Sequence, residues 1–478
     1  MRHTKIICTM GPNENDKELM LKMAKSYMDV ARFNFSHGDY AEHKSRLEML
    51  KEVRKEAGRP IAALLDTKGP EIRTGVLKDH KKIQLKEGNE IVLTTTECEG
   101  TEDRIYINYA GLAEDVHEGA YILIDDGLIA LKVLSVDGGD IHCRIQNDGE
   151  LGERKGVNVP NVKIKLPSLT PKDIEDIKFG IKEDFDIIAA SFVRDADCIR
   201  QIRALVDEAN ADMLIIAKIE NQEGIENIDS IIAEADGIMV ARGDMGIEIA
   251  PEKLPHIQKT IIKKCNEAGK IVITATQMLD SMIRNPRPTR AEVNDVANAV
   301  YDGTDCVMLS GETAMGKYPF EALEMMAKVV SNTEQFIDYD TYRNHKVAKT
   351  NFDQIANAVS HATISTAMRL HAGAVVAPTL TGKTALMLSK WRPTMPIYAL
   401  SPSMATVRKL MILWGIVPRW SKRADSTDEL IENSIDELKA DGLIQSDELV
   451  VVTAGVLSYR SRHEAAADTN IMRVIRVK

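Results

Sequence analysis

The sequence has few cysteines and few aromatic residues for its length. Six cysteines stand among 478 residues, and no two of them form a Cys-x-x-Cys pair. A small disulfide-stabilised scaffold is therefore excluded. Most of the cysteines lie in or beside apolar runs, which predicts buried free thiols and a reducing, cytoplasmic location. Aromatic residues make up only 5% of the chain, which disfavours a stacking platform for single-stranded nucleic acid.

Positive charge and long apolar runs are also scarce. The chain carries 61 Lys and Arg against 72 Asp and Glu, a formal net charge of −11. Proteins that bind nucleic acid over their whole length need a basic surface, so that class is disfavoured. No apolar run is long enough for a membrane span. The N-terminal residues resemble a β-strand more than a signal peptide, which would need a longer apolar core and a cleavage site.

What the chain does have is the composition of a globular protein long enough for about three domains. Apolar, β-branched runs alternate with amphipathic helical segments, a pattern typical of parallel strands covered by helices on both sides. There are eight such runs, which is the number of strands in a closed (β/α)8 barrel. They are residues 5–10, 30–36, 61–66, 185–192, 214–220, 237–244, 271–276 and 306–310.

The spacing of these units is broken once, between Asp66 and Phe185. The intervening segment contains short strand-like runs separated by Gly-rich turns, which predicts an inserted all-β domain, a small β-barrel. An insertion in a βα loop lies at the catalytic face of a barrel, where it can act as a lid.

A further α/β pattern follows the barrel and predicts a C-terminal three-layer domain. We therefore predict three domains. They are a catalytic barrel at 1–69 and 167–345, an inserted lid domain at 70–166, and a C-terminal effector and oligomerisation domain at 346–478.

Polar residues follow the predicted barrel strands, at the face where barrel enzymes carry their active sites. A single charged residue at a strand end usually just meets solvent, but charges at five of eight ends are harder to explain by a structural network alone. Glu220 and Asp244 follow neighbouring strands, and paired carboxylates without Cys or His suit Mg²⁺ or Mn²⁺. Four basic residues add positive charge at the same end of the predicted barrel, as phosphoryl transfer requires. They are Arg32, Arg73, Lys218 and Arg242. Oxygen donors that suit a second, weakly charged cation are Asn34, Ser36, Asp66 and Thr67.

Six segments together resemble the pyruvate kinase family, and the resemblance extends over the whole chain. They read ARFNFSHG from residue 31, LDTKGPEIRT from 65, AKIENQEG from 217, MVARGDMG from 239, ATQML from 275 and MLSGETA from 308. The resemblance is to bacterial members without an additional C-terminal extension. It implies a cytoplasmic homotetramer that transfers the phosphoryl group of phosphoenolpyruvate to ADP, giving pyruvate and ATP in the last step of glycolysis.

The resemblance also implies roles for particular residues. Glu220 and Asp244 would bind Mg²⁺ or Mn²⁺, and Lys218 would stabilise the phosphoryl group in flight. The phosphoenolpyruvate site would include Arg32, Lys218, Thr276 and the backbone N–H groups of Gly243 and Asp244, with Thr276 helping to deliver a proton. The nucleotide would contact Asn34, His37, Arg73 and Lys155. K⁺ would be held by Asn34, Ser36, Asp66 and Thr67, and Glu71 is the residue found in K⁺-dependent members.

A loop in the C-terminal region comes within one residue of a P-loop. Ala377 stands where the first Gly of that motif should be, so a phosphate-binding turn or a plain strand–helix turn is favoured over a true P-loop. In the family a similar loop binds a phosphorylated effector, such as a sugar phosphate or AMP. The candidate residues are Thr379, Thr381, Lys383 and Thr384. The loop at 456–468 lacks the Gly/Pro-rich pattern of many relatives, so the identity of the effector stays open.

Three hypotheses for function follow. The first is an allosterically regulated pyruvate kinase. The second is another barrel enzyme that acts on pyruvate enolate, such as a metal-dependent aldolase or lyase, but this leaves the lid and Lys155 unexplained. The third is a catalytically silent metabolite sensor, which would require a broken site, whereas every motif residue is intact.

Overall fold

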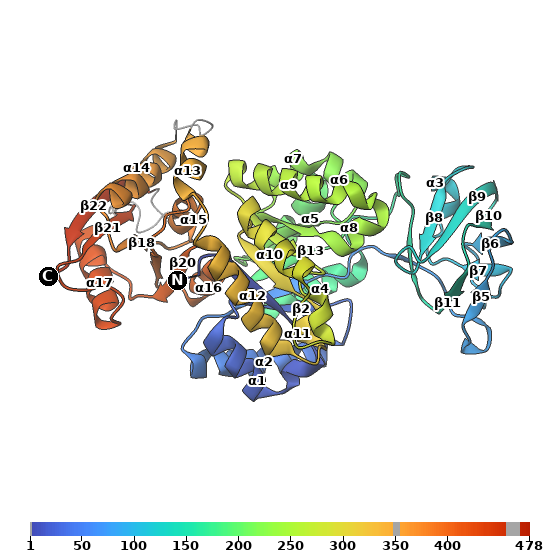
Figure 1. The fold of residues 1–478 in the computed structure, drawn as a ribbon, viewed down its shortest axis with the longest axis horizontal. Helices are drawn as coiled ribbons and strands as arrows, with labels where there is room; N and C mark the ends of the chain where they lie inside the picture. The colour runs from blue at the N-terminus through green and yellow to red at the C-terminus, as the bar shows by residue number, and fades with distance from the viewer. Residues whose placement is uncertain (1, 348–353, 456–468) are drawn as a thin grey trace.

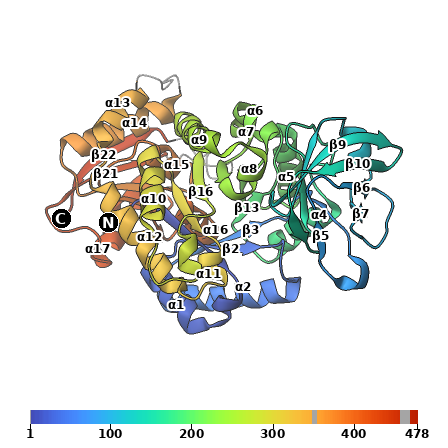
Figure 2. The same ribbon diagram turned by 45° about the vertical axis from the view of Figure 1, so that its right-hand side comes forward.

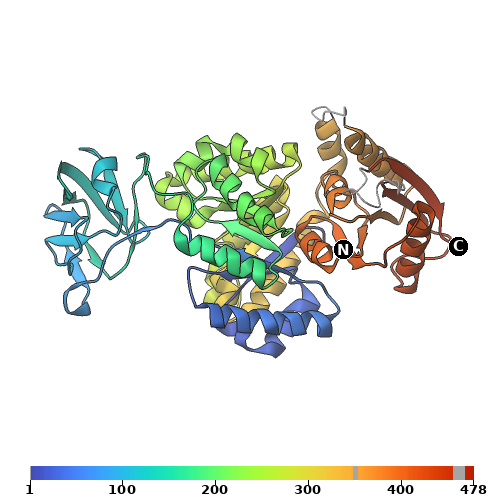
Figure 3. The same cartoon turned by 180° about the vertical axis from the view of Figure 1, so that it is seen from behind.

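The computed structural model describes residues 2–347, 354–455 and 469–478. Three bodies lie in a row, with the barrel in the centre, an all-β body at one end and an α/β body at the other (Figure 1). The views from 45° and from behind show the same arrangement (Figures 2 and 3). No helix in the described ranges is long and apolar enough to cross a membrane.

The central body is a closed barrel of eight parallel strands, as the sequence predicts. Around the barrel the order is β1-β17-β16-β15-β14-β13-β3-β2. Nearly every strand residue is buried, because side chains fill the barrel interior on one side and pack under helices on the other. The strands are β1 (Lys5–Met10), β2 (Val30–Asn34), β3 (Ala62–Asp66), β13 (Ile187–Ala190), β14 (Leu214–Ile219), β15 (Gly237–Ala241), β16 (Ile271–Ala275) and β17 (Cys306–Leu309).

Helices surround this barrel, and local sequence signals set several of their ends. Thr170 and Thr289 each begin a helix with a capping box, and α2 ends at Gly58 in the left-handed conformation. The α-helices are α1 (Lys17–Ser26), α2 (Tyr40–Ala57), α4 (Pro171–Lys182), α5 (Ala196–Glu208), α6 (Gln222–Glu226), α7 (Ile228–Glu234), α8 (Arg242–Glu248), α9 (Leu254–Ala268), α10 (Arg290–Asp302), α11 (Gly311–Ala314) and α12 (Pro319–Glu334). The next helix, α13 (Tyr339–Val347), lies beside the C-terminal body (Figure 1). Short 3-10 turns are η1 (Pro12–Asn15), η3 (Pro251–Lys253) and η4 (Asp280–Ile283).

The inserted body is a small β-barrel. Its seven-stranded sheet has the order β4-β12-β8-β9-β10-β6-β7. The two edge strands meet through a bridge between Thr74 and Ile107, and Gly75 N–H donates to Tyr106 O at 2.8 Å. This closure removes the open edges of the sheet. The elements are β4 (Ile72–Arg73), η2 (Lys78–His80), β5 (Ile83–Leu85), β6 (Glu90–Thr94), β7 (Arg104–Tyr106), α3 (Leu112–Asp115), β8 (Tyr121–Ile124), β9 (Ile129–Asp137), β10 (Asp140–Ile145), β11 (Gly149–Leu151) and β12 (Gly156–Asn158).

The C-terminal body is a five-stranded sheet between two helical layers, in the order β20-β19-β18-β21-β22, with β22 antiparallel. Val375 and Ala377 of β18 pack with residues of α14 and α15, whereas Ala374 and Val376 pack with residues of α17. The strands are β18 (Ala374–Pro378), β19 (Ile397–Ser401), β20 (Ile416–Trp420), β21 (Leu449–Ala454) and β22 (Ile471–Arg476). The helices are α14 (Ile355–Arg369), α15 (Lys383–Ser389), α16 (Met404–Lys409), η5 (Leu410–Ile412) and α17 (Thr427–Ala440).

Strand β20, which the sequence pattern did not predict, forms part of the contact with the barrel. Lys5 Nζ donates to Ile416 O at 2.6 Å, and Arg408 Nε donates to Asp186 at 2.7 Å. Lys5 and Asp186 lie at the amino ends of barrel strands. The C-terminal body therefore packs against the end of the barrel opposite to the face where active sites lie.

Candidate active site

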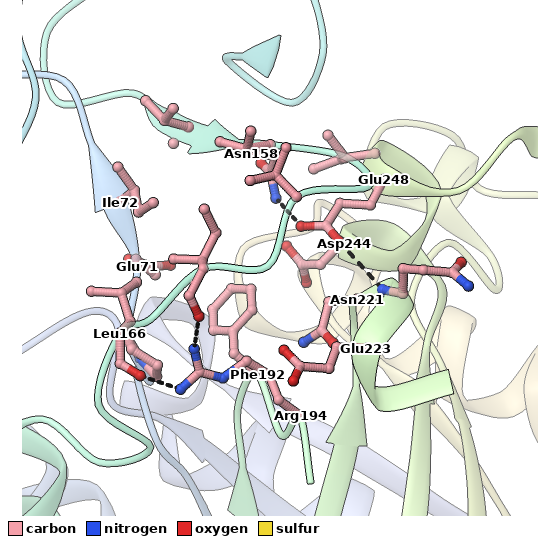
Figure 4. Close-up of a pocket in the computed structure, with 18 of the residues that line it drawn as sticks. Glu71, Ile72, Asn158, Leu166, Phe192, Arg194, Asn221, Glu223, Asp244 and Glu248 are labelled. Carbon is pink, nitrogen blue, oxygen red and sulfur yellow. Dashed lines mark hydrogen bonds between the residues drawn. The ribbon is translucent and has the colours of Figure 1, made fainter. Parts of the chain in front are cut away.

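A cavity of about 680 Å³ lies between the small β-barrel and the carboxyl ends of the barrel strands. From the barrel it is lined by Phe192, Asn221 and Asp244, among others, and from the inserted body by Arg73 and Lys155. Figure 4 shows Asp244, Asn221 and Glu223 on one wall, with Asn158 bonded to Glu248 across the cavity rim at 3.3 Å. The position agrees with the catalytic face expected for a barrel of this kind.

A network of buried charges connects the ends of β2, β3 and β14. Asp66 is fully buried and accepts from Arg32 Nε at 2.6 Å and from Lys218 Nζ at 2.9 Å. The ammonium of Lys218 also lies 3.0 Å from Glu220 Oε1 and donates to Ser191 Oγ at 2.7 Å. Two hydrogen bonds and the ion pair with Glu220 therefore fix the position of the charge.

The electrostatic environment keeps this network ionised. Burial alone would raise the pKa of Asp66, but Arg32 and Lys218 outweigh burial and hold that pKa below its usual value. Burial would lower the pKa of Lys218, but Asp66 and Glu220 raise it above its usual value. Lys218 is therefore a permanent cation near neutral pH.

Glu220 behaves differently. Burial raises the pKa of this carboxyl to about 7; the charge of Lys218 opposes the rise and that of Asp244 adds to it. Its second oxygen accepts the backbone N–H of Phe192 at 2.6 Å. A buried carboxylate next to a second carboxylate is a favourable place for a divalent cation, which would offset both the burial and the repulsion.

The donor set at this point fits Mg²⁺ or Mn²⁺ better than a metal held by protein alone. Among the residues that the structure describes, no group of three or more His, Cys, Asp or Glu side chains is arranged to hold a metal ion. Mg²⁺ usually takes one or two carboxylates and completes its shell with water and substrate phosphate. Glu220 and Asp244 provide two such carboxylates at neighbouring strands β14 and β15.

The residues predicted to hold K⁺ come from neighbouring strand ends. Asn34 and Asp66 are paired in register on β2 and β3. Asn34 Oδ1 accepts the N–H of Ser36 at 3.1 Å, and Thr67 Oγ1 accepts the N–H of Ser191 at 3.1 Å. Asp66 also serves the network of buried charges, so a cation here would share this carboxylate with Arg32 and Lys218.

Thr276 follows β16 and lies next to the start of α8. Its hydroxyl accepts the backbone N–H of Gly243 at 2.7 Å. A substrate carboxylate at Gly243 would therefore meet an N–H group that already has an acceptor. Thr276, Gly243 and Arg242 do not line the cavity. The guanidinium of Arg242 donates to the backbone oxygens of Ala275 at 3.2 Å and Thr276 at 2.7 Å.

On the lid side, two cations face the cavity and each has an acidic partner. Arg73 Nε donates to Glu71 at 2.7 Å, and Lys155 Nζ lies 2.9 Å from Asp125. His37, also predicted to contact the nucleotide, is exposed and does not line this cavity.

The C-terminal loop forms a turn at the start of α15. Thr379 Oγ1 accepts the N–H of Gly382 at 3.0 Å, and the hydroxyls of Thr384 and Thr469 lie 2.8 Å apart. Thr381 and Lys383 are exposed. The segment 456–468, whose role the sequence left open, lies outside the described residues.

Sequence reasoning assigned no role to Ser191. Its hydroxyl lies within bonding distance of Asp66, Lys218 and the carbonyl of Thr67. The one signal in the sequence was its place directly after the fourth barrel strand, β13, because polar residues at the ends of other barrel strands were assigned to the site on that ground.

Comparison with known proteins agrees with this geometry. The family described as "Pyruvate kinase, barrel domain" matches residues 1–323, and "Pyruvate kinase, alpha/beta domain" matches residues 357–475. The chain is 49% identical over 459 residues to a pyruvate kinase of Staphylococcus saprophyticus, covering 95% of this chain and 78% of that protein. It is 48% identical to a pyruvate kinase of Sporosarcina psychrophila, covering 99% of this chain and 80% of that protein.

A solved structure of a pyruvate kinase from Cryptosporidium parvum superposes with a TM-score of 0.94 at 39% identity, covering 100% of this chain and 96% of that one. Family, relatives and fold thus agree over all three bodies, and they favour a pyruvate kinase over the other two hypotheses. The chain belongs to the pyruvate kinase family of phosphotransferases.

Proposed function

We propose that the active site comprises the cavity between lid and barrel together with the network of buried charges at the ends of β2, β3 and β14. It would transfer the phosphoryl group of phosphoenolpyruvate to ADP, with Lys218 as the charge that stabilises the group in flight. The observation that carries this assignment is the position of Lys218 Nζ, fixed by Asp66 at 2.9 Å and Glu220 at 3.0 Å. A preorganised cation needs no reorganisation when charge develops in the transition state.

Glu220 and Asp244 would hold Mg²⁺ or Mn²⁺. When bound, this ion would neutralise phosphate charge and orient the donor and acceptor oxygens. The carboxylate of Glu220 must be deprotonated to bind it, and Lys218 at 3.0 Å favours that state. Asn34, Ser36, Asp66 and Thr67 would hold K⁺, and Glu71 supports K⁺ dependence.

Different residues would contact the two substrates. Arg32 and Lys218 would contact the phosphate of phosphoenolpyruvate, while the N–H groups of Gly243 and Asp244 would bind its carboxylate. Thr276 would help to deliver a proton to the enolate that remains after transfer. Arg73 and Lys155 line the cavity from the lid and would bind the nucleotide phosphates together with Asn34 and His37.

The lid would exclude water from the reaction, since water could otherwise accept the phosphoryl group. It would be formed by residues 70–166, with 1–69 and 167–345 as the catalytic domain. We also propose that residues 346–478 carry an effector site at Thr379, Thr381, Lys383 and Thr384, that the protein forms a homotetramer, and that it acts in the cytoplasm.

A coupled assay tests the function. The full chain should form pyruvate from phosphoenolpyruvate and ADP when Mg²⁺ and K⁺ are both present, and omission of either cation should reduce the rate. If no pyruvate forms under these conditions, the proposal is wrong. A panel of sugar phosphates and AMP in the same assay tests the effector site, because an unchanged rate with all of them would remove that part alone.

A further inference from the structure

The backbone directly after β16 is held in an unusual conformation. Thr276 has φ of 69° and Gln277 has φ of 53°, so two consecutive residues occupy the left-handed region. This region is disfavoured for residues with a Cβ atom, and most strongly for β-branched residues such as Thr. Such a conformation persists only where neighbouring groups hold it.

Arg242, at the start of α8, is the group that holds this segment. Its guanidinium donates to Thr276 O at 2.7 Å and to Ala275 O at 3.2 Å. The same guanidinium also donates to Asp295 of α10 at 2.7 Å. A planar guanidinium can reach all three acceptors at once, whereas a lysine ammonium cannot reproduce this fork.

Gly243, the next residue in the chain, contacts the side-chain hydroxyl of Thr276. Gly243 N–H donates to Thr276 Oγ1 at 2.7 Å. The dipeptide Arg242-Gly243 therefore fixes both the carbonyl and the hydroxyl of Thr276, and it directly precedes Asp244. The hydroxyl itself donates to Ala275 O at 2.6 Å, the same carbonyl that accepts from Arg242 Nε, so its position relative to the metal carboxylates depends on this segment and on the end of β16 together.

We propose that Arg242 is a positioning residue that holds Thr276 in place for protonation of the enolate and has no part in phosphoryl transfer. This proposal rests on the proposed function. In that step a proton from the Thr276 hydroxyl, relayed by water, forms a bond to the methylene carbon of the enolate. The carbon–carbon π electrons form the new C–H bond, and the enolate C–O bond becomes the carbonyl of pyruvate. The Thr276 alkoxide then takes a proton from a solvent water, which leaves as hydroxide.

The experiment compares two steps in the full chain loaded with Mg²⁺ and K⁺. The first is exchange of the methyl hydrogens of pyruvate in D₂O with ATP present, followed by NMR, which measures the proton step in reverse. The second is ATP formation in a single turnover from phosphoenolpyruvate and ADP, which precedes protonation. R242K should slow the exchange by about 100-fold, the typical effect of a misplaced catalytic group, and should leave single-turnover ATP formation within about threefold.

Arg203 provides a matched control. It is a partly buried arginine of α5 that donates to the carbonyl of Met213 at 3.3 Å and to Asp236, away from the cavity. R203K should leave both steps unchanged. If R242K does not fold, D295N retains the guanidinium but weakens its anchor, and it should slow the exchange by about tenfold with ATP formation unchanged.

The outcomes separate the two proposals. A wild-type protein that forms no pyruvate contradicts the proposed function itself. A wild-type protein with both activities, together with a folded R242K that exchanges at the normal rate, overturns the role of Arg242. An equal loss of both steps also overturns it, because Arg242 would then only support α8 and the metal carboxylate.

Discussion

Asp66→Asn is the substitution that tests the network of buried charges most directly. The carboxylate is fully buried between Arg32 Nε at 2.6 Å and Lys218 Nζ at 2.9 Å. An asparagine at this position keeps the shape but replaces one oxygen by an NH₂ group. That group must face one of the two cations, so a donor meets a donor and both positive charges lose their buried counter-charge.

The expected cost can be estimated from these contacts. Removal of one partner of a buried ion pair destabilises a protein by about 3–5 kcal/mol. Here Arg32 keeps its bond to Thr9 Oγ1 at 2.9 Å, and Lys218 keeps Glu220 at 3.0 Å. We therefore expect the lower end, about 3 kcal/mol in the free energy of unfolding. Displacement of the Lys218 charge should reduce kcat by about 100-fold.

Asp186 offers a control with the same chemistry at the other end of the barrel. It is buried between two arginines, Arg54 at 3.2 Å and Arg408 at 2.7 Å, and it precedes β13 at its amino end. Asp186→Asn removes the buried counter-charge of two arginines, but burial raises the pKa of Asp186, so the loss of stability should be smaller than for Asp66→Asn. The kcat of Asp186→Asn should stay within about threefold of the wild-type value, which corresponds to a change of less than about 1 kcal/mol in the activation free energy.

The assay measures kcat with saturating substrates at a temperature where circular dichroism shows both variants folded, and thermal denaturation gives the stability. The reasoning would be refuted if Asp66→Asn retained its kcat within threefold, or if Asp186→Asn lost as much activity. In the first case Asp66 would not position Lys218. In the second, general destabilisation would explain the loss.

Four further predictions follow from the site. Lys218→Met should lower kcat by about 1,000-fold or more in the coupled assay with an unchanged circular dichroism spectrum, because Asp66 retains Arg32; near-normal turnover would exclude Lys218 from the transition state. Burial raises the pKa of Glu220 to about 7 in the metal-free protein, so Mn²⁺ affinity should rise about tenfold per pH unit below 7 and level off above it, as measured by calorimetry. A rise in pH should increase the metal affinity but decrease the stability of the metal-free protein. A carboxyl whose pKa is raised in the folded state destabilises that fold when it ionises, so Glu220→Gln should raise Tm at pH 8 in the presence of a chelator. Glu71→Lys should make activity less dependent on K⁺, and an unchanged K⁺ titration would contradict the role inferred from Glu71.

The sequence by itself determined the architecture of the barrel and the identity of the family. Eight apolar, β-branched runs specify eight buried parallel strands, because such runs are stable only when both faces are covered. The six motifs lie at strand ends, where the chemistry of a barrel is found, so residue types and order were sufficient to indicate the reaction. The short strand β20 was missed because Ile416–Trp420 contains a proline and follows a 3-10 turn, which weakens its apolar pattern.

Only the tertiary structure decided how the charges are paired. The sequence placed Asp66 among the ligands of K⁺ and Arg242 among the cations at the catalytic end of the barrel, since each stands at a strand end. Folding brings Asp66 between Arg32 and Lys218 and turns Arg242 towards the backbone of Thr276. The physical reason is that sequence spacing fixes which strand end carries a group, whereas its partners come from strands and helices distant in the chain and depend on how those pack.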